Sequence, residues 1–171
     1  MIPALAASAL LAGCGDDGGG DVTTDPGSLV PSKRDYIVSA DTICAQADQA
    51  IQTEAEVGLG IGANDFELTS EGEIVFKSGR RPTDARIRRF GTGVVIPKLR
   101  EQLERLRALT PPSGDEAEVA AIYDRAERGI DRLAADPDAF SDAGAVRRSL
   151  TEARRLGRRY GFFECGTYSG P

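Results

Sequence analysis

The stretch YIVSADTICAQADQAI, residues 36–51, decides the fold of this chain of 171 residues. Its apolar and small side chains recur at steps of three and four, which places them on one stripe of an α-helix. The stripe consists of Tyr36, Ala40, Ile43, Cys44, Ala47 and Ile51. We therefore predict an amphipathic helix over residues 33–57, ended by the glycines at positions 58, 60 and 62.

Three later segments show the same helical period. We predict helices over residues 82–109, over residues 113–135, and from Pro137 to Gly161. Pro97 lies inside the first of these segments and predicts either a kink or a division into two helices, because proline has no backbone N–H to donate. Short connections between such helices favour antiparallel neighbours. The expected fold class is all-α, an antiparallel helical bundle of about four helices.

The ends of these helices carry recognisable capping residues. Ser113 and Glu116 have the spacing of a capping box and predict the start of the third helix. Asp136 is suited to the N-cap of the fourth helix, with proline at its first helical position. After this helix, Phe162 and Phe163 are expected to pack back onto the bundle.

Residues 65–77 interrupt the helical pattern. Phe66 and Leu68, and then residues 74–76, flank a polar stretch that contains Gly72, a pattern typical of a two-stranded hairpin. Because an isolated hairpin is marginally stable in water, it either lies on the helices or serves as a contact element. The alternatives are a variable loop and a partner-binding insert.

The N-terminus is short and apolar. The run Ile2–Ala12 is too short to span a membrane, which takes about 20 residues, and it fits the hydrophobic region of a secretory signal. A signal usually opens with Lys or Arg, which Met1–Pro3 lack, so we expect the true start codon upstream. The alternative is a frayed apolar tail with a chance cysteine.

The residues Leu11-Ala12-Gly13-Cys14 close this run, and they resemble a bacterial lipobox. The resemblance implies cleavage before Cys14, a lipid on that cysteine, and a mature protein anchored on the extracytoplasmic face of the cell membrane. We expect a signal peptide over residues 1–13, a flexible acidic tether over residues 14–32 and one helical domain over residues 33–171.

Two cysteines remain once Cys14 is assigned to lipid. We predict that Cys44 and Cys165 form a disulfide, since an even pair in an oxidising compartment usually does. Closing a loop of about 120 residues is worth on the order of 4–5 kcal/mol in the chain-entropy model. The alternative is two buried free thiols. A zinc site is disfavoured because the chain has no histidine.

Composition excludes several classes of function. Without histidine there is no imidazole base, metal ligand or Ser-His-Asp triad. The net charge of −6 argues against nucleic acid as a partner. Gly58, Gly60 and Ala63 match a loose dinucleotide fingerprint, but a helix precedes them where that motif needs a strand. We expect no catalytic residue, no cofactor and no metal.

One charged cluster on the last predicted helix is a candidate contact for an anionic surface. It consists of Arg147, Arg148, Arg154, Arg155, Arg158 and Arg159. Such a face would suit lipid headgroups or an anionic envelope polymer. The alternative is a solvated helix face whose arginines pair with acids on neighbouring helices.

Three motifs together resemble small uncharacterised actinobacterial lipoproteins and secreted helical proteins. They are Ile43-Cys44 on an early helix, the segment Leu106–Pro112 with the sequence LRALTPP, and the closing segment Tyr160–Cys165 with the sequence YGFFEC. The resemblance implies a disulfide-tied helical fold outside the cytoplasm and carries no catalytic residue with it.

These features favour a non-catalytic envelope lipoprotein. We expect its helices to present a binding surface for a protein partner or an anionic envelope component. The alternative is a small-ligand binder with a pocket between the helices, opened at Pro97. An enzyme that uses carboxylates alone is the third hypothesis, and it would need two acids with raised pKa values in one cleft.

Overall fold

The fold was analysed in a computed structural model that describes residues 30–62, 64–68, 74–77 and 79–165. Most of the described chain is helical, as predicted. The predicted signal peptide and Cys14 lie outside the described residues. In chain order the elements are α1 (Lys33–Leu59), β1 (Phe66–Leu68), β2 (Ile74–Phe76), α2 (Asp84–Phe90), a π-helical segment (Gly91–Val95), α3 (Ile96–Arg107), α4 (Glu116–Ala135), a 3-10 helix (Pro137–Ser141) and α5 (Ala143–Tyr160).

Helix α1 buries the predicted apolar stripe along its whole length. All six members of that stripe are buried, and the stripe continues through Ala55 and Leu59. The helix begins where Ser32 Oγ accepts a hydrogen bond of 3.2 Å from the backbone N–H of Asp35. It ends at Gly60, whose φ of 66° lies in the left-handed region that glycine adopts without strain.

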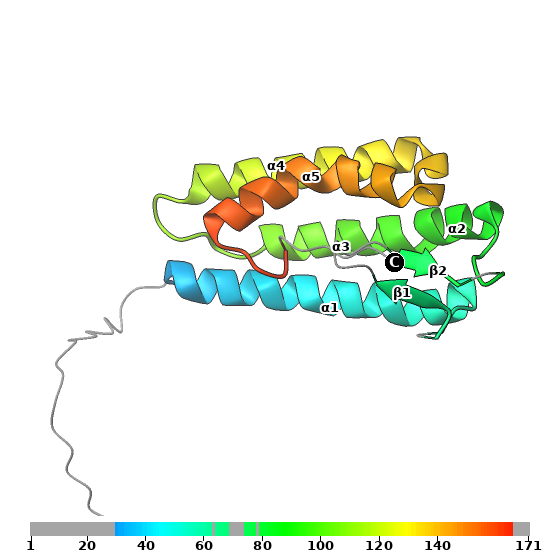
Figure 1. The fold of residues 1–171 in the computed structure, drawn as a ribbon. Coiled ribbons are helices and arrows are strands. Elements are labelled where there is room, and N and C mark those ends of the chain that lie inside the picture. Colours follow the sequence, from blue (N-terminus) through cyan, green and yellow to red (C-terminus); the bar gives the residue numbers. More distant parts are fainter. Residues whose placement is uncertain (1–29, 63, 69–73, 78, 166–171) are drawn as a thin grey trace, which may run out of the picture.

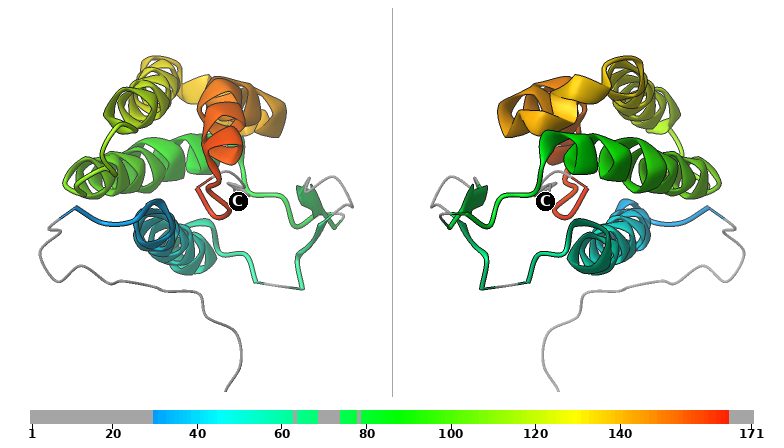
Figure 2. Two further views of the ribbon diagram at one scale, coloured as in Figure 1. Left: turned by 90° about the vertical axis from the view of Figure 1, so that its left-hand side faces the viewer. Right: turned by 90° about the vertical axis from the view of Figure 1, so that its right-hand side faces the viewer.

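The long helices lie lengthwise in two layers. Helices α1 and α3 form one layer and α4 and α5 the other, and the end-on views show the same pairs (Figures 1 and 2). Along the long axis, α1 and α4 run in one direction and α3 and α5 in the opposite one (Figure 1). Helix α3 packs against both α1 and α4, whereas α5 packs mainly against α4. The core lies between the layers.

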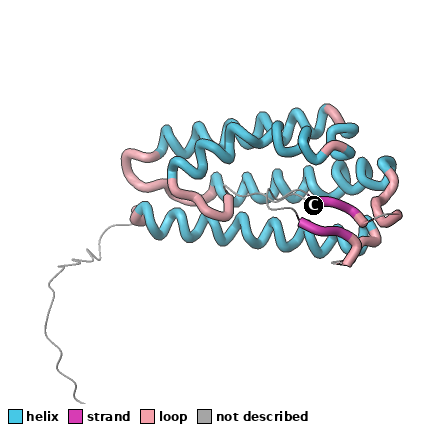
Figure 3. The backbone as a smooth tube through the Cα atoms, viewed as in Figure 1, coloured by secondary structure: helices cyan, strands magenta, loops and turns pink. Residues whose placement is uncertain are grey.

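The two strands lie at one end of the helices, between α1 and α2 in the chain (Figure 3). They pair antiparallel, with Phe66 opposite Phe76 and Leu68 opposite Ile74. The predicted turn with Gly72 lies outside the described residues.

The second predicted helix changes type before Pro97. The chain stays helical from Asp84 to Arg107, but residues 91–95 form a π-helical turn in which the Ile96 N–H donates to the Gly91 carbonyl, five residues back. Pro97 then lies in the first turn of α3, where its missing N–H breaks no bond. This agrees with the predicted division into two helices, α2 and α3, which are joined by a wider turn that accommodates the proline.

The predicted capping box at the start of α4 is wrong in its first half. Helix α4 begins at Glu116 after Asp115, so Ser113 is not its N-cap. The carboxylate of Glu116 does reach back and accepts a hydrogen bond of 2.8 Å from the Gly114 N–H. The φ of 91° at Gly114 redirects the chain there, which moves the helix start past Ser113.

The predicted start of the last helix is also wrong. Asp136 and Pro137 open the short 3-10 helix, because proline at a first helical position suits either helix type. Helix α5 begins after Asp142, whose carboxylate accepts a hydrogen bond of 2.8 Å from the Gly144 N–H.

The close approach of α4 and α5 at Gly129 yields a stability prediction. A Cβ atom on Gly129 would lie 2.5 Å from the Ser149 carbonyl oxygen and 2.7 Å from Leu150 Cδ2. Although alanine favours a helix by about 1 kcal/mol over glycine, the clash forces the helices apart. We expect Gly129→Ala to lower the free energy of unfolding by about 1–3 kcal/mol in urea denaturation.

Gly93→Ala is the matched control, because a Cβ atom there meets nothing within 4 Å. It should leave the free energy of unfolding equal or slightly raised. A Gly129→Ala variant as stable as Gly93→Ala would contradict the close packing of α4 on α5.

Candidate functional site

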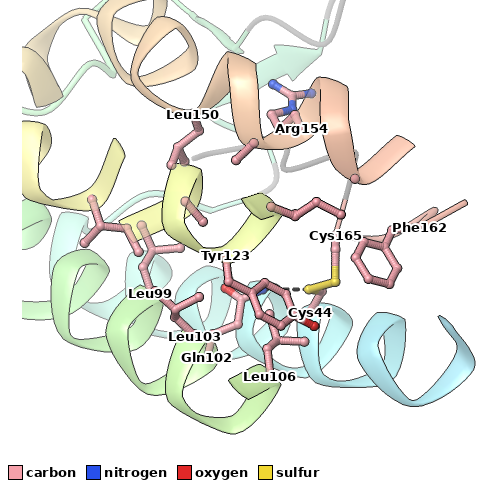
Figure 4. A pocket seen from close by; sticks show the side chains of 15 residues that line it. Cys44, Leu99, Gln102, Leu103, Leu106, Tyr123, Leu150, Arg154, Phe162 and Cys165 are labelled. Carbon is pink, nitrogen blue, oxygen red and sulfur yellow. Dashed lines mark hydrogen bonds between the residues drawn. A yellow bond between two sulfur atoms is a disulfide. The ribbon is translucent and has the colours of Figure 1, made fainter. Parts of the chain in front are cut away.

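A pocket of about 80 Å³ lies between α3, α4 and α5 (Figure 4). Its walls on α3 and α4 are mainly apolar and buried, and they consist of Leu99, Gln102, Leu103, Leu106, Ile122, Tyr123, Ala126 and Ile130. On α5 the wall is made by Leu150, Ala153, Arg154 and Gly157. The space exists because α5 packs on α4 and not closely on α3.

The predicted disulfide between Cys44 and Cys165 is confirmed, and it forms one wall of this pocket (Figure 4). It joins the middle of α1 to the segment after α5, across 121 residues of sequence. The side-chain amide nitrogen of Gln102 lies 2.8 Å from Cys44 Sγ, so the polar end of Gln102 is directed at the disulfide. The cystine therefore closes the pocket on the α1 side.

A carboxylate on α1 holds the segment that carries Cys165. Asp41 accepts hydrogen bonds from the backbone N–H groups of Phe163, at 3.0 Å, and Cys165, at 3.1 Å. Phe162 is 3% exposed and lines the pocket, whereas Phe163 is 70% exposed. The expectation that both rings pack inward is thus wrong for Phe163, because the backbone contact with Asp41 turns its side chain toward solvent.

Tyrosine hydroxyls near the pocket are already engaged. The hydroxyls of Tyr36 and Tyr123 share a buried hydrogen bond of 2.6 Å, and Tyr160 donates one of 2.8 Å to Asp115. Burial raises the pKa of Tyr123, and the bond to Tyr36 raises it further. Tyr123 therefore stays neutral and contributes its ring to the apolar wall.

Charged groups gather where α5 faces α1. Burial raises the pKa of the Asp48 carboxyl to about 6; the negative charge of Glu164 adds to this, and Arg154 partly offsets it. Burial also lowers the pKa of Arg154, and the nearby guanidinium groups of Arg158 and Arg147 lower it further. Arg154 is half-buried and remains charged, because guanidinium does not deprotonate in proteins.

The six arginines predicted as one anionic-surface contact divide into two rows along α5. Spacing of seven and eleven residues places Arg147, Arg154 and Arg158 in one row and Arg148, Arg155 and Arg159 in the other. In the second row, Arg148 pairs with Asp142 at 3.0 Å and Arg155 with Glu152 at 2.8 Å. These acids belong to α5 or its N-cap, whereas the alternative interpretation placed them on neighbouring helices.

The described residues offer little other chemistry. They contain no cluster of three or more Cys, Asp or Glu side chains placed to hold a metal ion. A carboxylate enzyme would need two acids with raised pKa values in one cleft, and the pocket has one such acid nearby, Asp48. Within the same described ranges, no helix has the length and apolarity needed to cross a membrane.

Comparison with known proteins identifies no relative: the chain matches no family model, no curated protein and no solved structure. A functional site is therefore inferred from the geometry of the chain's own residues.

Three polar residues at or near the pocket were not predicted from the sequence. Asp41 and Asp48 lie beside the apolar stripe of α1, and Gln102 lies among the leucines of α3. Their positions at the edge of a stripe are the one sequence signal that points to partial burial.

The raised pKa of Asp48 predicts a pH-dependent stability. Its folded-state pKa, about 6, exceeds the ordinary value of an aspartate carboxyl, 3.8, so the folded state binds the proton more tightly. Stability contributed by this proton is present below about pH 4 and is lost as the pH rises through 6. We expect Asp48→Asn to raise the free energy of unfolding at pH 7.5 by about 1–2 kcal/mol, discounted for solvent screening.

Urea denaturation at pH 7.5 and pH 4 measures this difference, which should shrink to near zero at pH 4. Glu54→Gln, at an exposed carboxylate of the same helix, serves as control and should change little at either pH. Equal effects of Asp48→Asn on the free energy of unfolding at both pH values would show that the ionised Asp48 carboxylate does not destabilise the fold.

Proposed function

We propose that this chain is a lipid-anchored extracytoplasmic protein whose helical domain binds a small, largely apolar ligand. The pocket between α3, α4 and α5 is the observation that supports this proposal. Ligand sites are typically apolar and concave with a few convergent polar groups, and here Arg154 and Gln102 supply the polar groups. The pocket therefore supports ligand binding over a helical surface that binds a protein partner.

The energetics of an open apolar space favour an occupant. Because the pocket is partly open to solvent, its apolar walls contact water, and a ligand that covers them gains about 25 cal/mol per Å² of apolar surface buried. A dry engineered cavity of about 150 Å³ in another protein binds benzene, so a space of 80 Å³ suits a group of about three carbon atoms. A ligand that fills it removes this apolar surface from water.

The proposed architecture is an antiparallel bundle of about four helices with a β-hairpin insert between α1 and α2. A short ligand enters between the helices, and the lipid on Cys14 with its tether over residues 14–32 keeps the domain near the membrane. The domain then acts as a binding protein without catalytic residues, cofactor or metal.

A second candidate function is contact with an anionic envelope component. Arg158 and Arg159 are exposed and make no salt bridge with any residue that the structure describes. These two arginines form a small cationic patch at the C-terminal end of α5. This patch is narrower than the six-arginine face expected from the sequence.

Filling the pocket should abolish ligand binding. Ala126 lines the pocket from α4, so Ala126→Leu places three additional carbon atoms in it. We expect 1-butanol to shift the amide signals of pocket residues in ¹⁵N–¹H spectra of the unmodified protein, and these shifts to disappear in Ala126→Leu.

Ala120→Leu is the matched control, because Ala120 is exposed on the same helix. It should bind 1-butanol as the unmodified protein does. If 1-butanol produces no saturable shifts at pocket residues in the unmodified protein, the pocket is not a ligand site.

The anchor is tested separately from the pocket. Cys14→Ser removes the sulfur that would carry the lipid, and two or more acyl chains are what hold a protein stably on a membrane. We expect the full chain to sediment with membranes and the Cys14→Ser variant to remain in the soluble fraction. A variant that stays membrane-bound would overturn the lipobox interpretation.

A further inference from the structure

We propose that the end of the domain at which residues 14–32 join α1 docks on an anionic phospholipid bilayer. The ring of Phe163 lies at the lipid surface in this contact, and exposed arginines of α1 and α5 lie on the headgroups. This inference rests on the proposed lipid anchor at Cys14, and it adds the partner of the cationic patch and the orientation of the domain.

Helix α1 begins and helix α5 ends at the same end of the domain (Figures 1 and 2). The Nζ atom of Lys33, the first residue of α1, lies 3.9 Å from the ring centre of Tyr160, the last residue of α5. An anchor on Cys14 reaches the domain through residues 14–32 and joins it here. It therefore holds this end closer to the membrane, on average, than the end with the two strands.

Two exposed apolar side chains lie on this part of the domain. Phe163 is 70% exposed and Val38 is 59% exposed. Asp41, three residues after Val38 on α1, accepts a hydrogen bond from the Phe163 N–H, which places both side chains on one side of the domain. Transfer of such side chains from water into the interfacial region of a bilayer is favourable.

Exposed arginines lie on both helices at this end. Arg34 is one helical turn before Val38 on α1. Arg158 and Arg159 occupy the last turn of α5. None of these three arginines forms a salt bridge with any residue that the structure describes. Each positive charge near an anionic lipid surface strengthens binding about fivefold.

Several acids on this side are engaged within the protein. Asp35 accepts a hydrogen bond from the N-cap hydroxyl of α1, and Asp41 accepts two from the backbone after α5. Asp115 pairs with Lys33 at 3.4 Å, and Glu164 is half-buried. Two further acids in the first turn of α4 belong to the layer opposite α1 (Figure 2). These arrangements reduce the repulsion that the acids would exert on anionic headgroups.

A bilayer fits this surface better than a soluble anionic polymer does, because it offers an apolar layer beneath charged headgroups. Three charges and one ring give only weak, reversible binding. The anchor makes the contact intramolecular and so raises the effective concentration of the bilayer. Without the lipid the contact is too weak to hold the chain, and the Cys14→Ser variant is therefore still expected in the soluble fraction.

Phe163→Trp reports the contact directly, because the chain has no tryptophan of its own. Cys14 is the one cysteine outside the disulfide, so the full chain can be coupled through it to a maleimide lipid in vesicles. On phosphatidylcholine with about one-third phosphatidylglycerol, we expect blue-shifted emission and quenching by lipids with brominated chains. Both effects should disappear at about 1 M salt, where the Debye length is about 3 Å.

Val57→Trp is the matched control for position. Val57 is 79% exposed near the other end of α1. On the same vesicles, the Val57→Trp chain should show neither the blue shift nor the quenching.

Charge is tested in the Phe163→Trp chain. Arg158→Gln combined with Arg159→Gln should lower the ratio of docked to undocked domain about 30-fold, at about fivefold for each charge. Arg125→Gln combined with Arg128→Gln removes two exposed arginines of α4 and should leave that ratio nearly unchanged.

The outcomes separate docking from anchoring. If the Phe163→Trp chain shows neither effect on anionic vesicles, or if the Val57→Trp chain is quenched equally, docking through this end is overturned. An equal shift on pure phosphatidylcholine overturns the anionic surface as partner. The maleimide lipid keeps these results independent of whether Cys14 carries lipid in cells, which the Cys14→Ser fractionation tests by itself.

Two other partners of this surface have their own signatures in the Phe163→Trp chain. A blue shift that grows with protein concentration in the absence of vesicles would assign the surface to a second copy of the chain. A shift caused by polyphosphate without vesicles would assign it to an anionic polymer. Either result overturns docking on the bilayer.

Discussion

The disulfide between Cys44 and Cys165 is the constraint on which the site depends. Helix α5 packs on α4 and leaves space toward α1 and α3. The cystine spans that space by fixing the segment after α5 onto the middle of α1. The two hydrogen bonds accepted by Asp41 fix the same segment. The disulfide thus replaces part of the side-chain packing that would otherwise join the two layers of helices. The layers therefore stay together although a pocket lies between them.

The π-helical turn before Pro97 positions the opposite wall. Its extra residue changes the angle at which successive side chains leave the helix axis, so α2 and α3 present their stripes in different directions. Gly91 permits the ring of Phe140 to lie against the backbone there, since a Cβ atom would come within 2.3 Å of that ring. Leu99, Leu103 and Leu106 can then face the pocket while Phe90 stays in the core.

Helical periodicity was enough to predict the helices and their buried faces. The stripe from Tyr36 to Ile51 is buried as expected, because burial of one face is what a 3.6-residue period encodes. The starts of α4 and α5 were misplaced, because Gly114 with its φ of 91° turns the chain after Ser113, and the side chain of Asp142 caps α5 in place of Asp136. The pocket could not be predicted, because it depends on how closely α5 approaches α3, and no local pattern records that distance.

The arrangement of charge on α5 also could not be predicted from the number of its arginines. A count of six positive side chains predicts one cationic face, but a helix places residues seven and eleven apart in the same row, so these six arginines form two rows. One row has acids on its own helix, Asp142 and Glu152, that neutralise two of its members. The other row includes Arg154, which lines the pocket and is attracted by the negative charge of Asp48 on α1. Because burial strengthens electrostatic interactions, the half-buried Arg154 affects the electrostatic potential of the pocket more than the solvated arginines of α5 do.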